Sequence, residues 1–273
     1  MITLRRNPLA VIGFIIIAGI LLLALIAPLI APYDPDAINV KAILLSPTSN
    51  HLMGTDGLGR DVFSRMLFGA RISLMVGFVA VGIATIIGII LGAIAGFYRG
   101  WVDTLIMRTV DVMLSIPTFF LILAVIAFLT PSIWNIMIVI GLTSWMGVTR
   151  LVRAEFLSLR HREFVLAAQV LGAKDVRLIF THLLPNSLTP IIVSSILGIA
   201  SAVLVESGLS FLGLGVQAPQ ASWGNILTDD ISLNTCYNTT KISDWEKTCN
   251  QVYAPDNWFD AIIALDIDTG AKV

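Results

Sequence analysis

The stretch SLMVGFVAVGIATIIGIILGAIAGF, residues 73–97, contains no charged side chain and is almost entirely apolar. An α-helix needs about 20 apolar residues to cross the hydrocarbon core of a bilayer, so this stretch predicts a membrane-spanning helix. Gly88, Gly92 and Gly96 recur at every fourth position, a spacing that lets helix backbones approach closely in a membrane. Glycine is also simply common in membrane helices, but the spacing favours a packed bundle over an isolated anchor.

The composition of the whole chain agrees with a membrane protein. Of its 273 residues, 56% are hydrophobic and 13% are charged, and the mean hydropathy is +0.88. Soluble domains carry about 25% charged residues, and water cannot solvate a surface so poor in charge. No basic domain or stripe indicates a nucleic-acid partner. The sequence therefore predicts an all-α, polytopic helical bundle in contact with membrane lipid.

Four further segments are apolar enough to cross the membrane, at residues 9–30, 103–129, 136–151 and 187–214. The first follows Arg5 and Arg6 as a signal peptide would, but it exceeds the ~7–15 residues of a signal peptide's apolar region and is predicted to be retained. Pro117 interrupts the third segment, and a proline inside a helix removes one hydrogen bond and kinks the helix. A kink that shapes a transport pathway and an inert kink both fit this position.

The distribution of basic residues predicts the orientation of these five spans. With a cytoplasmic N-terminus, ten basic residues lie in cytoplasmic segments and four in the outside loop. The ten are Arg5, Arg6, Arg99, Arg108, Arg150, Arg153, Arg160, Arg162, Lys174 and Arg177, and the four are Lys41, Arg60, Arg65 and Arg71. The positive-inside rule favours this orientation over the opposite one.

The loop at residues 152–186 is predicted to form a compact knob of two short helices on the cytoplasmic face. Good helix formers begin at Glu163 and end before Gly172, which takes the position of the glycine that follows a helix. A second short helix is predicted over residues 174–184, stopping at Pro185.

This loop resembles the cytoplasmic EAA loop of ABC importer permeases, although a generic amphipathic loop is the alternative. The residues that match the motif are Ala167, Ala168, Gly172, Leu184 and Pro185, while Leu166 replaces the motif's glutamate. In that family the loop carries the coupling helix that docks on the ATP-hydrolysing subunit. The resemblance implies a coupling surface made of Phe164, Ala167, Ala168, Gly172, Ala173, Leu184 and Pro185.

Two further blocks resemble dipeptide, oligopeptide and nickel importer permeases. The first is HLMGTDGLGRDVFSR at residues 51–65 with GARISL at residues 69–74, whose alternating Asp and Arg can pair; alone, these charges would indicate a solvated loop. The second is ESGLSFLGLGVQ at residues 206–217 with SWGN at residues 222–225. Glu206 is interpreted as the one acidic residue well inside a predicted span, and a carboxylate inside the membrane is a candidate functional residue because it is costly to place there.

Glu206, Ser207 and Pro117 are the candidates for a translocation path or gate. For Glu206, a place on the solute path and a structural role, protonated or paired, both remain open.

The resemblance covers residues 1–228 and implies a permease subunit of an ATP-driven importer in a bacterial-type inner membrane. It implies two ATP-binding cassette subunits, which would bind ATP and Mg, a second permease subunit and an extracytoplasmic solute-binding protein. The chain has no P-loop sequence G-x-x-x-x-G-K-[ST], so it is predicted not to be an enzyme and to depend on a partner for ATP hydrolysis. No cofactor or metal is expected in this chain. The sequence does not identify the solute; a peptide or a related small solute is expected.

The tail at residues 229–273 departs from the family pattern, which has a sixth span here. It is polar, and its end resembles a blade fragment of quinoprotein alcohol dehydrogenases, with the turn Asp268-Thr269-Gly270. The odd number of spans places this tail outside the cell. Cys236 and Cys249 can form a disulfide or remain thiols.

A fusion, a frameshift or an assembly artefact is expected for this tail, with a divergent tail as the alternative. The competing functions are a membrane-anchored quinoprotein dehydrogenase fragment, a non-functional truncated chimera and a channel.

Overall fold

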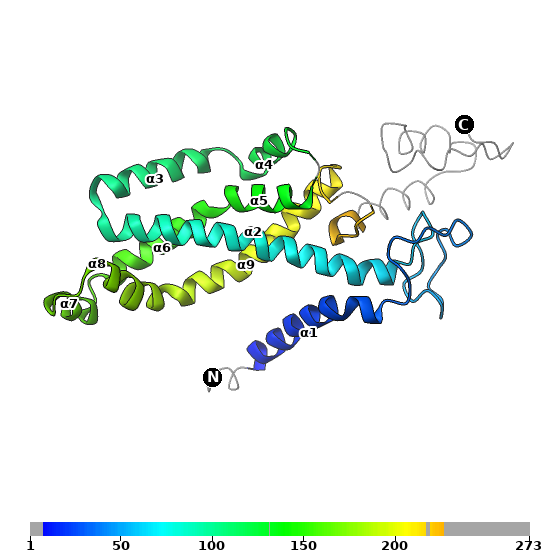
Figure 1. Cartoon of the computed structure of the whole chain (residues 1–273), viewed down its shortest axis with the longest axis horizontal. Helices are drawn as coiled ribbons and strands as arrows, with labels where there is room; N and C mark the ends of the chain where they lie inside the picture. Colours follow the sequence, from blue (N-terminus) through cyan, green and yellow to red (C-terminus); the bar gives the residue numbers. More distant parts are fainter. Residues whose placement is uncertain (1–7, 131, 217–218, 227–273) are drawn as a thin grey trace. The chain divides into compact units, whose positions relative to one another are not determined.

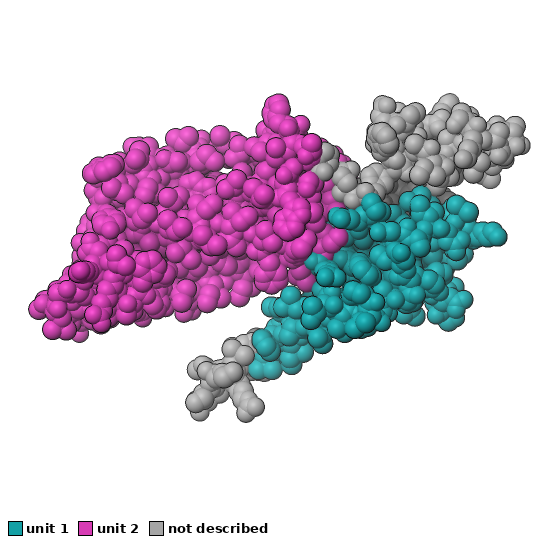
Figure 2. All heavy atoms as spheres, in the orientation of Figure 1, with its two compact units in different colours: residues 1–71, 218–273 teal, residues 72–217 magenta. Residues whose placement is uncertain are grey.

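The computed structural model describes residues 8–130, 132–216 and 219–226, and these residues form helices joined by turns and loops (Figure 1). No strand occurs in these three ranges, which confirms the all-α prediction. The chain divides into two compact units, residues 1–71 with 218–273, and residues 72–217 (Figure 2). The predicted tail from residue 229 lies outside the described residues.

The first unit contains helix α1, Pro8–Ile30, which agrees with the predicted span at residues 9–30. Apolar side chains on α1 are largely exposed, with Leu25 at 73% and Leu29 at 86%. Water would oppose such exposure, whereas a hydrocarbon environment favours it. Helix α1 therefore has the surface of a membrane-spanning helix.

Helix α2, Val62–Tyr98, begins well before the predicted start of its span at residue 73. The Asp61 carboxylate accepts a 2.8 Å hydrogen bond from the Ser64 backbone N–H, which satisfies a free donor in the first turn. A helix of 37 residues is about 55 Å long, whereas the hydrocarbon core is about 30 Å thick. The helix therefore extends beyond the membrane, and the apolar run marks its membrane-embedded part.

In the second unit, the predicted third span is two helices, α3 at Gly100–Ser115 and α4 at Thr118–Ile126. Their axes are bent by 80° at the break beside Pro117, so the predicted interruption is confirmed (Figure 1). Ile116 is extended, with φ −95° and ψ 124°, as expected for a residue that precedes proline.

The fourth span also consists of two helices, α5 at Ile133–Thr143 and α6 at Trp145–Leu159. Helix α6 continues eight residues past the predicted end of the span at residue 151, because its last turns need not lie in hydrocarbon. Helix α9, Leu184–Phe211, forms the fifth span and ends at a turn through Gly213, whose φ is +74°.

The predicted stop at Pro185 is wrong. Helix α8, Asp175–Arg177, leads into the π-helical segment η2, Leu178–Leu183, and then directly into α9. A π-helical turn is wider than an α-helical turn and has i→i+5 hydrogen bonds. Pro185 follows this wider turn within the first turn of α9, where a proline ring is tolerated.

Glycines of α2 provide the contact with α6. Added Cβ atoms would lie 2.5 Å from Val148 at Gly88, 2.7 Å from the Thr149 carbonyl oxygen at Gly92, and 2.7 Å from Phe156 at Gly96. The predicted role of this glycine spacing in helix packing is confirmed. On another face of α2, the Thr85 and Ser195 hydroxyls form a 3.0 Å hydrogen bond to α9.

Candidate functional site

The knob consists of helix α7, Glu163–Val170, together with α8 and η2. Two hydrogen bonds close the end of α7: the Ala173 N–H donates to the Ala168 carbonyl at 3.0 Å, and the Gly172 N–H donates to the Gln169 carbonyl at 2.9 Å. Gly172 has a φ of +79°. This is the Schellman arrangement, so the predicted role of Gly172 after the helix is confirmed.

The knob is anchored to the spans by a buried apolar cluster. Val165 of α7 is fully buried there with Phe97 of α2, Phe156 of α6 and Leu183 of η2. Val165 and Leu183 were not among the predicted coupling residues, because this cluster of residues distant in the sequence decides which face of α7 is inward.

Three of the predicted coupling residues, Ala168, Ala173 and Leu184, pack against this same cluster. The structure therefore uses them to fix the knob to its own spans. Ala167 and Pro185 are exposed, and Phe164 is 43% exposed.

The outer surface of the knob is more apolar than the prediction suggested. Val170 and Leu171, at the end of α7, are 88% and 87% exposed, and Phe180 of η2 is 64% exposed. Clustered exposed apolar side chains of this kind mark interaction surfaces. The feature of the sequence that could have indicated this apolar surface is the pair of large apolar residues directly before Gly172.

Two ion pairs join α3 to α6. The Arg153 guanidinium donates to both carboxylate oxygens of Asp103, at 2.5 and 2.7 Å, and the Arg150 guanidinium lies 2.5 Å from the Asp111 carboxylate. Asp111 lies inside the predicted third span, so describing Glu206 as the one acidic residue well inside a span was wrong. Arg108, counted among the cytoplasmic charges, also lies within α3.

The candidate gate residues lie apart from the knob along the chain. Glu206 is fully buried, and its carboxylate accepts a 2.8 Å hydrogen bond from the Ser210 hydroxyl. That hydroxyl oxygen also accepts the Val216 N–H at 3.3 Å, in the turn after α9. Ser207 donates to the Val203 carbonyl at 2.9 Å within the helix. Glu206 is thus linked to a structural turn, and its place on a translocation path stays a prediction.

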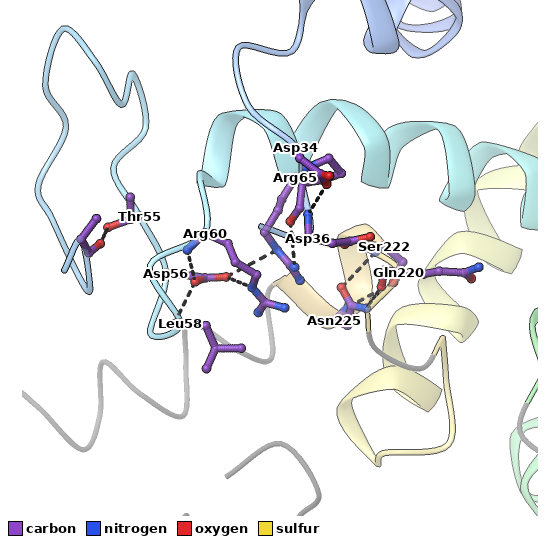
Figure 3. Close-up of polar contacts among 12 residues, drawn as sticks. Asp34, Asp36, Thr55, Asp56, Leu58, Arg60, Arg65, Gln220, Ser222 and Asn225 are labelled. Atoms are coloured by element: carbon purple, nitrogen blue, oxygen red, sulfur yellow. Dashed lines mark hydrogen bonds and ion pairs between the residues drawn. The ribbon is translucent and has the colours of Figure 1, made fainter. Parts of the chain in front are cut away.

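In the first unit, the charges of residues 51–65 form a buried network (Figure 3). The Asp56 carboxylate lies 2.7 Å from the Arg60 guanidinium and 3.5 Å from that of Arg65. It also accepts the backbone N–H groups of Leu58 and Arg60 at 2.9 Å. The predicted pairing of Asp with Arg is confirmed, but the solvated loop is wrong: these three charged side chains are at most 5% exposed. Sequence spacing could suggest the pairing but not the fold of the surrounding loop.

The segment at residues 219–226 packs against the first turns of α2 within the first unit. The Trp223 indole N–H donates to the Met66 carbonyl at 3.2 Å, and a Cβ on Gly69 would lie 3.2 Å from the Ser222 carbonyl carbon. The Asn225 side-chain oxygen accepts a hydrogen bond from the Ser222 N–H, and its amide nitrogen donates one to the Gln220 carbonyl (Figure 3). Two blocks that are distant in the sequence therefore meet in the structure.

The model of the family described as binding-protein-dependent transport system inner membrane component matches residues 88–238. The N-terminal TM domain of oligopeptide transport permease C matches residues 1–47. The chain belongs to the binding-protein-dependent inner membrane permeases. It is therefore a permease subunit of an ABC importer, as the sequence predicted.

Several curated relatives of this permease carry peptide-transport names. It is 46% identical over 226 residues to the dipeptide transport system permease protein DppC of Alkalihalophilus pseudofirmus, covering 83% of this chain and 74% of the relative. It is 40% identical over 237 residues to the oligopeptide transport system permease protein OppC of Bacillus subtilis, covering 87% and 78%. It is 42% identical over 226 residues to the probable D,D-dipeptide transport system permease protein DdpC of Escherichia coli, covering 83% and 76%.

The described part of the permease contains four helices long and apolar enough to cross a membrane, or five if the bent pair α3 and α4 is one span. This agrees with the five spans predicted and with a multi-pass membrane protein. Within the described ranges no group of three His, Cys, Asp or Glu side chains is placed to hold a metal ion. The absence of a cofactor, the quinoprotein resemblance of the tail and the pairing of Cys236 with Cys249 stay predictions.

Proposed function

We propose that this permease carries dipeptides or oligopeptides into the cell, with ATP and Mg bound by separate ATP-binding subunits. The peptide-transport names of its relatives support the substrate class. The chain itself would act as a conduit and not as an enzyme. A second permease subunit would complete the path, and an extracytoplasmic binding protein would deliver the peptide.

The outer surface of the knob is the observation that carries the coupling role. Val170, Leu171 and Phe180 expose large apolar side chains, while Val165 on the same short helix is fully buried. A rigidly anchored apolar projection is suited to a groove in a partner subunit, because burial of its exposed area would stabilise the complex. In this proposal the knob and the N-terminus face the cytoplasm, where ATP is available, and the loop at residues 31–61 faces outward.

Replacing Leu171 with Asp tests the docking role. A charge placed in an apolar interface is expected to weaken it, so the ATP-binding subunits should no longer co-purify with the permease and peptide uptake should be lost. Leu52→Asp is the matched control, because Leu52 is 58% exposed in the first unit and lies outside the knob. Unchanged co-purification of the ATP-binding subunits with Leu171→Asp would refute the docking role.

The substrate class needs a separate measurement. The complete importer, reconstituted with its binding protein, is expected to accumulate a labelled dipeptide only when ATP is present. Accumulation of another solute class instead, with no peptide uptake, would refute the peptide assignment but leave the docking role intact.

A further inference from the structure

Helix α3 carries a polar stripe along one face. Thr104, Arg108, Asp111 and Ser115 follow one another at spacings of four, three and four residues, and all are exposed. These spacings place side chains on the same side of a helix. Exposed apolar side chains lie on the adjoining part of this same side, three or four residues from members of the stripe, among them Trp101, Leu105 and Val112. The exposed side of α3 therefore has a polar part suited to water beside an apolar part suited to lipid.

Helix α6 has an exposed face of similar character. Its exposed residues are Gly147, Arg150, Ala154 and Ser158, at spacings of three, four and four. This face therefore consists of small side chains and one guanidinium. A Cβ added to Gly147 would meet nothing within 4 Å, so there is open space beside this residue in the structure.

The polar faces of α3 and α6 adjoin at the pair of Asp111 and Arg150. The two side chains lie 2.5 Å apart and are 50% and 51% exposed. By comparison, Asp103 and Arg153 are only 16% and 31% exposed. The accessible ion pair joins the two faces, which together we name the α3–α6 polar face.

Both members of this ion pair fall within predicted spans. Asp111 is eleven residues after the start of α3 at Gly100, or about 16 Å along a helix, and Arg150 is next to the end of the predicted fourth span, although it was counted among the cytoplasmic charges. A charged side chain inside a membrane helix is costly unless it is paired or meets water. The exposed face of α9 instead carries Ile192, Ile196 and Leu204, which hydrocarbon accommodates. Lipid therefore suits α9, and water suits the α3–α6 polar face.

We propose that the α3–α6 polar face lines the aqueous translocation path, and that Asp111 and Arg150 contact the charged ends of the solute. Asp111 is complementary to an ammonium group, and Arg150 can bind a carboxylate through two N–H groups. In the empty path the two side chains neutralise each other. When a zwitterionic solute binds, its ammonium group pairs with Asp111 in place of Arg150, and its carboxylate pairs with Arg150 in place of Asp111. The solute chemistry rests on the proposed peptide function, because a peptide with free ends carries both charges.

Single cysteines test whether water reaches this face. In a chain with Cys236 and Cys249 replaced by Ser, Ala154→Cys places a thiol on the polar face, and Leu204→Cys places one on α9, where Leu204 is 72% exposed. The assembled importer in membrane vesicles is treated with a charged, membrane-impermeant methanethiosulfonate. We expect the thiol at position 154 to react at least tenfold faster than the one at 204, and a dipeptide to slow its reaction.

Each other outcome overturns a part of the proposal. Equal, slow reaction at both positions with the charged reagent, but fast reaction with an apolar maleimide, would show that lipid covers the face. No reaction at position 154 with either reagent would show that a second permease subunit covers it. Fast reaction at position 154 with no slowing by dipeptide would refute the contact between peptide and ion pair.

Charge variants of the pair provide the second test. Asp111→Asn and Arg150→Gln are each expected to reduce uptake of a zwitterionic dipeptide at least tenfold while the complex still assembles, as measured by co-purification. Asp111→Asn should affect a dipeptide with a blocked amino end much less, because the ammonium is absent. Equal losses for blocked and free dipeptides would overturn the assignment. If the unaltered importer takes up no peptide, the proposed function fails, and the cysteine reactivity still decides whether the face lines the path.

Discussion

The Arg160 guanidinium donates a 2.6 Å hydrogen bond to the Phe97 carbonyl and lies over the Phe97 ring, 5.6 Å from its centre. Phe97 is in the last turn of α2, where backbone carbonyls have no partner within the helix. Arg160 directly follows α6 and precedes the knob. One side chain therefore closes the end of α2 and ties it to the base of the knob, so the knob is connected to both α2 and α6.

Arg160→Ala is expected to loosen this connection. A hydrogen bond to a charged group contributes about 1.5–3 kcal/mol, and the cation–π contact adds about 0.5–1 kcal/mol at an accessible site. Thermal unfolding of the purified complex should occur at a lower temperature, and transport per ATP hydrolysed should fall. Arg162→Ala, at an exposed arginine two residues later, is the control. Equal behaviour of the two variants would contradict the role of Arg160.

Gly172 isolates the effect of backbone conformation, because an added Cβ would meet nothing within 4 Å while φ is +79°. A left-handed conformation costs an L-residue roughly 1–2 kcal/mol, and a β-branched side chain suits it least. Gly172→Val is therefore expected to disturb the knob and uncouple ATP hydrolysis from uptake, with membrane insertion intact. Gly172→Asn should retain most uptake, since Asn tolerates this conformation. Full uptake by the Val variant would count against a coupling role for this turn.

The knob shows which parts of the site were readable from sequence. Helix α7 and its end at Gly172 depend on local signals, helix formers followed by a glycine, and both were predicted. Which side of α7 faces outward depends on the cluster around Phe156, formed by residues distant in the sequence. For this reason Ala168 was assigned to a partner's groove, while the exposed Leu171 was overlooked.

The span boundaries show a similar division. Hydropathy locates the part of a helix that lies in hydrocarbon, so the five spans were found but α2 and α6 were predicted too short. The capping of α2 by Asp61 and the wide turn before Pro185 are backbone features that hydropathy does not record. The burial of Asp56 was missed because charged residues in a loop ordinarily favour water.

The buried network of the first unit predicts a large effect for Asp56→Asn. This change removes the carboxylate that the guanidiniums of Arg60 and Arg65 both contact, at 2.7 and 3.5 Å. Loss of one member of a buried ion pair costs about 3–5 kcal/mol, so the variant should unfold far more readily in detergent. Asp34→Asn changes an exposed carboxylate of the same loop and should have little effect. Similar unfolding temperatures for the two variants would refute the structural role of Asp56.

Asp36 predicts a pH dependence in the same loop. Partial burial raises the pKa of its carboxyl above the usual 3.8, against the opposing effect of the Arg65 charge. Because the folded state then binds the proton more tightly, this contribution to stability is full at low pH and is lost as the pH rises through the folded pKa. Asp36→Asn avoids that loss and should unfold at a higher temperature than the unaltered protein at pH 7. The difference between the two unfolding temperatures should shrink below about pH 4. A difference that stays constant with pH would contradict the predicted role of Asp36.

Two glycines of α2 allow the same substitution to be compared on one helix. A Cβ at Gly92 would lie 2.7 Å from the Thr149 carbonyl oxygen and 2.7 Å from the Val152 Cβ, whereas one at Gly82 would meet nothing within 4 Å. Gly92→Ala must push α6 away and is expected to cost about 1–3 kcal/mol, as overpacking generally does. Gly82→Ala should be neutral or stabilise by up to about 1 kcal/mol, because alanine favours a helix. Unfolding in detergent would measure both, and equal effects would mean that α2 and α6 do not pack through Gly92.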